Sequence, residues 1–265
     1  MKEKTSHIFT RWFCLGLGVA LCISLAPRPA ISAEGLNPDA DEILRSMSSY
    51  LGGATSFSVN ADIDDEIVTQ DGQKLQLSSY ATIIMERPAK LHIQRKGRLA
   101  DVEFIFDGKT LTVYGKNLNV YGQMDAPGTI DDAIRALEIE TGLSAPGADL
   151  LFSDPYAVLS SGIEGSAYLG IAYIDDVACH HLAFREAKVD WQLWVQAGDA
   201  PLPMKYVITT KWVTGAPQYE IRLRDWDTKP LIKAGEFTFS VPKDARRLET
   251  IPVNEMGEIT IEEGK

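Results

Sequence analysis

Residues 57–64 read FSVNADID, and this stretch decides the fold because apolar and polar side chains alternate in it without a break. Every second residue from Phe57 to Ile63 is apolar, and the residues between them are serine, asparagine or aspartate. Successive side chains of a β-strand point to opposite faces, so the alternation predicts a half-buried strand. The Asp71-Gly72 pair that follows is typical of a tight hairpin turn, and it leads into a second apolar run over residues 75–85.

Similar short apolar runs occupy much of the remaining chain. They lie at residues 91–94, 102–106, 111–114 and 119–123 and, after an interruption, at 167–174, 177–185, 191–196, 204–213, 218–227 and 237–241. Asp107-Gly108 gives a second hairpin signal between two of these runs. Connections this short cannot carry the crossovers that parallel strands need, so the runs predict an antiparallel meander.

Three segments have the periodicity of helices instead. The first spans residues 37–53, opens with Asn-Pro as an N-cap and first helical residue, and ends in two glycines. The second begins at Thr129, where Asp132 three places later resembles a capping box, and it ends at Gly142. The third is short and covers residues 154–162. The predicted order is therefore helix, strands, two helices, strands.

This order predicts an α+β fold built on one curled sheet. About eleven strands are more than a twisted open sheet holds comfortably without curling. The helices are too few to cover both faces of a flat sheet. We therefore expect a curled antiparallel half-barrel with the helices on its concave side.

The first 33 residues resemble an export signal. Lys2, Lys4 and Arg11 precede an apolar run over residues 12–25, and the small-residue sequence Ala-Ile-Ser-Ala at 30–33 follows it. About 14 apolar residues are too few to cross a bilayer core, which takes roughly 20. We expect a secretory signal peptide that is cleaved near Ala33, and retention as a membrane anchor is the less favoured alternative.

The three cysteines have different predicted fates. Cys14 and Cys22 lie in the leader, where Phe13 and Leu21 precede them instead of the small residue that a lipoprotein signal requires, so no lipid-anchored N-terminus is expected. Cleavage leaves Cys179 as a single thiol, which excludes an internal disulfide. A lone cysteine in an apolar strand is usually a small buried hydrophobic residue.

The charge is strongly negative, with 37 Asp+Glu against 26 Lys+Arg and a formal net charge of -11. This argues against a nucleic-acid partner, because such proteins neutralise phosphates with a basic face. Loss of the leader, which has four basic residues and one acidic residue, lowers the net charge to -14. No repeat or linker divides the rest, so we expect a single domain over residues 34–248 and an acidic tail over 249–265.

Few residues have the pattern of a catalytic or metal site. Cys179, His180 and His181 are the best candidates, but neighbouring strand residues point to opposite faces, so the two imidazoles do not converge easily on one metal. His92 could in principle join either of them. We find no nucleophile elbow, HExxH helix, phosphate-binding loop or dinucleotide fingerprint, so we predict a protein without enzymatic activity, cofactor or metal.

Aromatic residues form apolar stripes along several predicted strands. Phe104 with Phe106, Trp191 with Leu193, and Tyr206 with its alternate neighbours each share one face. From the pattern alone, a packed core is favoured over a ligand cavity. Two tryptophans break the pattern: Trp194 and Trp226 fall on the more polar faces, where they would cover a sheet edge or a partner surface.

Longer strings carry a resemblance to a known family. They are FDGKTLTVY at 106–114, APGTIDDAI at 126–134, SDPYAVL at 153–159, CHHLAFR at 179–185, DWQLWV at 190–195 and PLPMKYVIT at 201–209. Together they resemble a family of predicted exported bacterial proteins of unknown function. That family in turn resembles the lipoprotein-carrier superfamily typified by LolA, LolB and LppX, in which a curled sheet of about eleven strands has helices on its concave side.

The resemblance implies a periplasmic carrier that holds a hydrophobic ligand, a lipid or an acylated polypeptide. Carried over by position, the helix that covers the cavity would contribute Ile130, Ile134 and Leu137. The cavity wall would contribute Phe104, Phe106, Trp191, Leu193 and Tyr206. One alternative is an envelope interaction or sensor module that binds a polypeptide. The other is a metalloprotein or enzyme centred on Cys179, His180 and His181.

Overall fold

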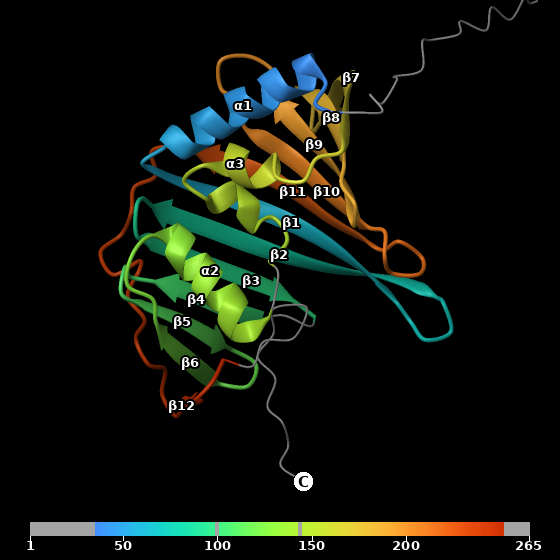
Figure 1. Ribbon diagram of the computed structural model, residues 1–265. Helices are drawn as coiled ribbons and strands as arrows, with labels where there is room; N and C mark the ends of the chain where they lie inside the picture. Colours follow the sequence, from blue (N-terminus) through green and yellow to red (C-terminus); the bar gives the residue numbers. More distant parts are fainter. Residues whose placement is uncertain (1–34, 99–100, 143–144, 252–265) are drawn as a thin grey trace, which may run out of the picture.

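The structure is a computed structural model that describes residues 35–98, 101–142 and 145–251 (Figure 1). One sheet of 12 strands dominates it, in the order β12-β6-β5-β4-β3-β2-β1-β11-β10-β9-β8-β7. Its strands are β1 Ser56–Val68, β2 Lys74–Glu86, β3 Lys90–Gly97, β4 Asp101–Phe106, β5 Thr110–Gly115, β6 Val120–Asp125, β7 Gly165–Ile174, β8 Val177–Arg185, β9 Val189–Gln196, β10 Pro203–Thr210, β11 Gln218–Asp227 and β12 Arg246–Arg247.

The sheet curls but does not close on itself, because β12 and β7 lie at the two ends of the strand order. All neighbouring strands are antiparallel except β12, which runs parallel to β6. The seam between β1 and β11 joins the first meander to the second. The predicted fold class is therefore confirmed.

The helices lie on one side of the sheet, inside its curve (Figure 1). They are α1 Pro38–Gly53, α2 Ile130–Thr141, the 3-10 turn η1 Ala148–Leu151 and α3 Pro155–Leu159. α1 packs across β7, β8 and β9, and its N-cap Asn37 accepts a hydrogen bond from the amide of Ala40 at 3.1 Å. No helix in the described part of the chain is long and apolar enough to span a bilayer.

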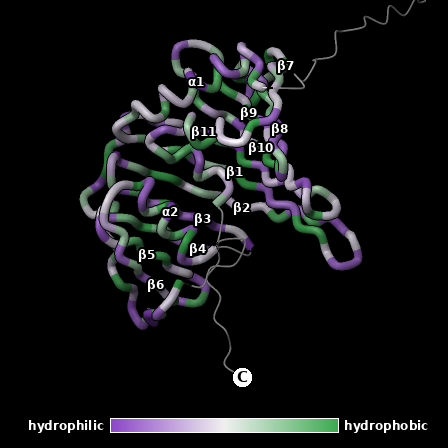
Figure 2. Tube along the Cα trace, in the orientation of Figure 1, coloured by the Kyte–Doolittle hydropathy of each residue, from purple (hydrophilic) through white to green (hydrophobic). Residues whose placement is uncertain are grey.

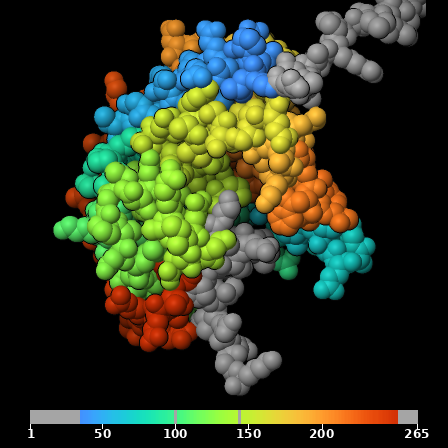
Figure 3. Space-filling view, viewed as in Figure 1, coloured from blue at the N-terminus to red at the C-terminus, as the bar shows by residue number. Residues whose placement is uncertain are grey.

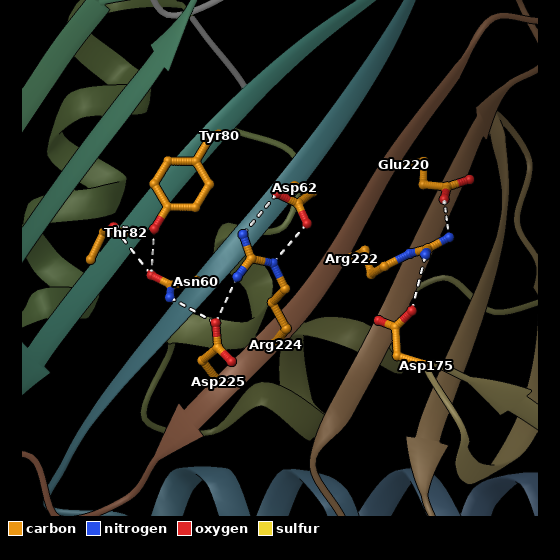
Figure 4. A network of polar contacts seen from close by, with 9 residues as sticks. All are labelled: Asn60, Asp62, Tyr80, Thr82, Asp175, Glu220, Arg222, Arg224 and Asp225. Atoms are coloured by element: carbon orange, nitrogen blue, oxygen red, sulfur yellow. Dashed lines mark hydrogen bonds and ion pairs between the residues drawn. The ribbon is translucent and has the colours of Figure 1, made fainter.

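The two faces of the sheet differ in chemistry because the side chains alternate, and hydropathy along the strands alternates accordingly in Figure 2. Toward the helices, the strands contribute buried residues such as Val59, Ile83 and Leu223. On the other face, Arg224 binds Asp62 at 2.8 Å as part of the polar network in Figure 4. The inner face is therefore the place for an apolar site.

One predicted strand is wrong. Residues 237–241 are irregular, and the strand at this edge is β12, which follows them. The apolar side chains of this segment are used in packing instead of a strand ladder: Phe239 packs against Tyr114 and Tyr121 with ring centroids 5.7 and 5.1 Å apart. The expected leader at residues 1–33 and most of the expected tail at 249–265 lie outside the described residues.

Candidate ligand-binding cavity

A cavity of about 200 Å³ lies between the inner face of the central strands and the segment from α2 to η1. Its floor comes from β1, β2, β3, β4, β5 and β11, and its roof from α2 and residues 145–151. In Figure 3 the segment from α2 to α3, green to yellow, covers the sheet, with a recess between it and the orange strands. The lining is predominantly apolar.

Strand register builds the floor as rows of directly opposed side chains. One row is Val59, Ile83, Ile93 and Phe104, each residue the pairing partner of the next. The next row is Phe57, Met85, Leu91, Phe106 and Leu111, paired in the same way. Such cross-strand pairs stabilise a sheet face. Here they form a continuous apolar surface under the cavity.

α2 is fixed over this floor by its sequence. Its N-cap box is complete: Thr129 accepts from the amide of Asp132 at 3.2 Å, and the Asp132 carboxylate accepts from the amide of Thr129 at 2.8 Å. The apolar face of the helix places Ile134 and Leu137 in the cavity lining. Asp131 accepts hydrogen bonds from the amide and hydroxyl of Ser153, at 2.9 and 2.6 Å, which tie α2 to the segment before α3.

The eight residues predicted for the site divide into two groups. Phe104, Phe106, Ile134 and Leu137 line the cavity. Ile130, Trp191, Leu193 and Tyr206 are buried in the hydrophobic core and are not among the lining residues. That any of the eight contacts a ligand stays a prediction.

Trp191 and Tyr206 of the second group pack together, with ring centroids 5.7 Å apart, beside an unusual carboxylate. Trp191 stacks on Phe184 with ring centroids 3.9 Å apart, and its Nε1 donates to Glu186 at 2.7 Å. Tyr206 hydrogen-bonds to Asp149 of η1. Burial raises the pKa of Asp149 to about 6, and the nearby carboxylates of Glu138 and Glu186 add to this shift.

Trp226 is a lining residue that the sequence prediction missed. One residue of β1 opposes two residues of β11, Asp225 and Trp226, and Asp225 has the left-handed φ of 55° that aspartate tolerates better than most residues. This bulge turns Trp226 from the polar face into the cavity, where its ring lies 5.2 Å from that of Phe57. Its Nε1 donates to the carbonyl of Pro203 at 3.0 Å.

Arg95 is a second missed residue. It follows Leu91 and Ile93 on the inner face of β3 and lines the cavity with them. Its Nε donates to the hydroxyl of Ser79 on β2 at 3.0 Å. The predicted strand ended at residue 94, three residues before the end of β3, although the two-residue spacing from Leu91 was the signal that could have extended it to Arg95.

The alternative site at Cys179, His180 and His181 is spread over different environments. Cys179 is fully buried, and burial raises its pKa. His180 hydrogen-bonds to Tyr168 at 3.0 Å, whereas His181 stacks on Trp194 with ring centroids 4.0 Å apart. Among the described residues, no three His, Cys, Asp or Glu side chains are grouped so that they could hold a metal ion.

Comparison with known proteins places the chain in a family. A family model described as "Predicted periplasmic protein (DUF2092)" matches residues 40–251. The chain belongs to this family. The family resemblance predicted from the sequence is thereby confirmed. No curated protein matches this DUF2092 chain.

Solved structures resemble this DUF2092 protein remotely. An uncharacterized conserved protein from Thermus thermophilus has a TM-score of 0.47 at 12% identity, and the match covers 80% of this chain and 99% of that one. The lipoprotein LppX from Mycobacterium tuberculosis has a TM-score of 0.42 at 12% identity, and the match covers 74% of this chain and 98% of that one. A LolA superfamily protein from Nitrosomonas europaea has a TM-score of 0.37 at 11% identity, and the match covers 76% of this chain and 97% of that one.

Proposed function

We propose that this protein binds a hydrophobic ligand in the periplasm, a lipid or an acylated polypeptide, and catalyses no reaction on it. The observation that supports the proposal is the apolar cavity between the strand floor and α2. Ligand pockets are concave and mostly apolar with a few polar groups, and this lining has that composition. The proposed site consists of the residues that line the cavity together with the four predicted residues that are buried in the hydrophobic core, so that it includes all eight predicted residues.

The proposal includes export and cleavage. Removal of the leader near Ala33 would leave one domain over residues 34–248 and an acidic tail, with a net charge of -14. A surface of that charge disfavours adsorption to anionic membranes. Such a protein would take its ligand from a membrane or a partner without binding the membrane surface.

Magnitudes limit the affinity. Burial of a 14-carbon chain at ~0.8 kcal/mol per methylene contributes roughly 11 kcal/mol. Association costs of about 4 to 15 kcal/mol offset most of this. One chain held by apolar contacts alone would therefore bind weakly, and additional polar contacts or closure of the cavity roof would be needed for a stable complex.

Fluorescence tests the proposal directly because Trp226 lies in the cavity lining. The delipidated protein would be titrated with dansyl-undecanoic acid, with excitation of tryptophan. We expect saturable one-to-one binding with sensitised dansyl emission, reduced in Trp226→Phe and reversed by palmitate. Emission that does not saturate, or that palmitate does not displace, would contradict the proposal.

A further inference from the structure

The cavity is not uniformly apolar. Among the described residues that line it, Arg95 and Glu138 are the charged ones. They come from opposite walls, because Arg95 lies on β3 in the sheet and Glu138 lies on α2 in the roof. A ligand in this cavity would therefore have one end beside a cation and another region beside an anion.

Arg95 is held at the floor by the sheet itself. It is paired in register with Ala81 on β2 and Val102 on β4, so small and apolar side chains flank its stem. Its Nε donates to Ser79 at 3.0 Å, which orients the plane of the guanidinium. Arg95 also lies near enough to Tyr219 to oppose the rise in the pKa of that phenol, to about 12, that burial causes. Tyr219 itself lines the cavity.

Glu138 has a different neighbour. It lies near Asp149 of η1 and helps to raise the pKa of that carboxyl above its usual range, after the larger effect of burial. The negative part of the lining is thus on the side of α2 and η1, away from the sheet. An anionic ligand group is repelled there and attracted at Arg95.

The size of the cavity limits the ligand further. At about 200 Å³ it is smaller than the roughly 300 to 1,000 Å³ of pockets that hold drug-sized ligands. This volume suits a single acyl chain better than two or three. A guanidinium is the side chain that best matches the two oxygens of a carboxylate or phosphate, because its planar fork binds both.

We propose that the ligand is a single-chain amphiphile with an acidic head, a carboxylate or a phosphate, which Arg95 binds while the acyl chain occupies the apolar cavity. This rests on the proposed function, since it names the ligand class of the same site. Arg95 selects the head, and the rows of apolar side chains on β1 to β5 accept the chain.

Competition for the dansyl probe tests the proposal with three ligands of one chain length: palmitate, 1-palmitoyl lysophosphatidate and hexadecanol. The variants are Arg95→Gln and the matched control Lys96→Gln, which removes a charge from the next residue of β3, on the opposite face and exposed. In the wild type and in Lys96→Gln, at least one of the two acids is expected to bind about tenfold or more tighter than hexadecanol, as a charge-assisted hydrogen bond allows. In Arg95→Gln that preference disappears, whereas hexadecanol affinity is unchanged.

The three ligands and two variants give a different result for each possible outcome. Whether palmitate or the lysophosphatidate binds tighter shows which acidic head the site takes. Equal affinity of the wild type for both acids and for the alcohol overturns the proposal even if Arg95→Gln does not fold, and so does a preference that survives in Arg95→Gln. Failure of all three ligands to displace or replace the probe overturns the proposed function itself, and this inference with it.

Discussion

At the scale of single residues, Asp149 is a carboxylate whose environment disfavours its charge. Burial raises its pKa to about 6, from a usual value of 3.8, with further contributions from Glu138 and Glu186, while Tyr206 donates a hydrogen bond that opposes the shift. Because the folded state binds this proton more tightly than the unfolded state, the group stabilises the fold at acid pH. That contribution is lost as the pH rises through about 6.

Asp149→Asn removes this titration. The variant is expected to gain stability relative to the wild type between about pH 4 and pH 7, by at most about 3 kcal/mol for a shift of this size. Urea unfolding of both proteins at several pH values measures the difference. A difference that stays constant over this range would contradict the assignment.

His92 is expected to give a pH dependence of the same sign as Asp149, with its stabilisation lost at higher pH. Burial lowers its pKa, but hydrogen bonds to Glu103 at 2.7 Å and Glu236 at 2.9 Å outweigh burial and raise it, and Lys116 lies 3.6 Å from Glu103. A raised pKa means that the protonated imidazole stabilises the fold below pH 6.5, and that this is lost as the pH rises through the folded-state pKa. His92→Gln should therefore destabilise the protein more at about pH 6 than at about pH 9.

His181 provides the matched control, because burial lowers its pKa by more than the hydrogen bond to Gln192 raises it, and Lys205 lowers it further. The unfolded state then binds the proton more tightly, so the stability of the wild type relative to His181→Gln should rise between about pH 5.5 and 7.5. Denaturant unfolding at several pH values measures the stability of each variant relative to the wild type. If this difference changes with pH in the same direction for both histidine variants, the pKa shift assigned to one of the two histidines is contradicted.

Two cavity residues show what strict alternation cannot predict. Strict alternation along β11 assigns Trp226 to the polar face. The assignment is wrong because the bulge at Asp225 adds one residue to the strand and so reverses the face of the next side chain. Arg95 is missed because an arginine ends an apolar run for any pattern based on hydrophobicity alone. A bulge depends on pairing with a distant strand, so its position follows from the three-dimensional register and not from the local sequence.

At the scale of elements, α2 was predictable because its signals are local. The Thr129 and Asp132 box, the apolar stripe and Gly142 at the C-terminus all appear in the structure as predicted. The irregular structure of residues 237–241 was not predictable, because the alternation in this segment matches a strand. In the structure its Phe239 packs against Tyr114 and Tyr121 instead. Periodicity identifies a buried face but does not show whether a strand partner exists.

α2 also offers a test of the cavity with an internal control. Ile134→Asp places a carboxylate in the lining, whereas Ile139→Asp makes the same change on the same helix at a side chain that is 84% exposed. The first is expected to weaken dansyl-undecanoate binding at least about tenfold, because a charge in an apolar cavity stays hydrated or must be neutralised. The second should bind as the wild type does.

A further variant keeps this prediction testable if Ile134→Asp does not fold. Ile134→Trp stays apolar but fills space, so it should also reduce probe binding while the protein remains folded by circular dichroism. Equal affinity of Ile134→Trp, Ile139→Asp and the wild type would place the probe outside this cavity.

At the scale of the whole molecule, the central feature is one curved sheet with opposite chemistries on its two faces. The outer face at the β1–β11 seam has exposed ion pairs such as Arg224 with Asp62, and pairs in this setting contribute little to stability. The inner face has the apolar floor and the helical roof. The sequence allowed the curl to be inferred from strand number and helix count, whereas the space left between floor and roof depends on how all the side chains pack.

The existence of that space is the central claim, and native mass spectrometry of the protein purified gently from the cells that produce it naturally tests it most directly. We expect the chain that begins after the leader to carry one noncovalent adduct of a few hundred daltons, which dissociates on activation as an acyl-chain lipid and is reduced in Ile134→Asp. A spectrum that shows only the mass of the protein without an adduct, together with no lipid in an organic extract of the same sample, would contradict the claim that the cavity holds a ligand.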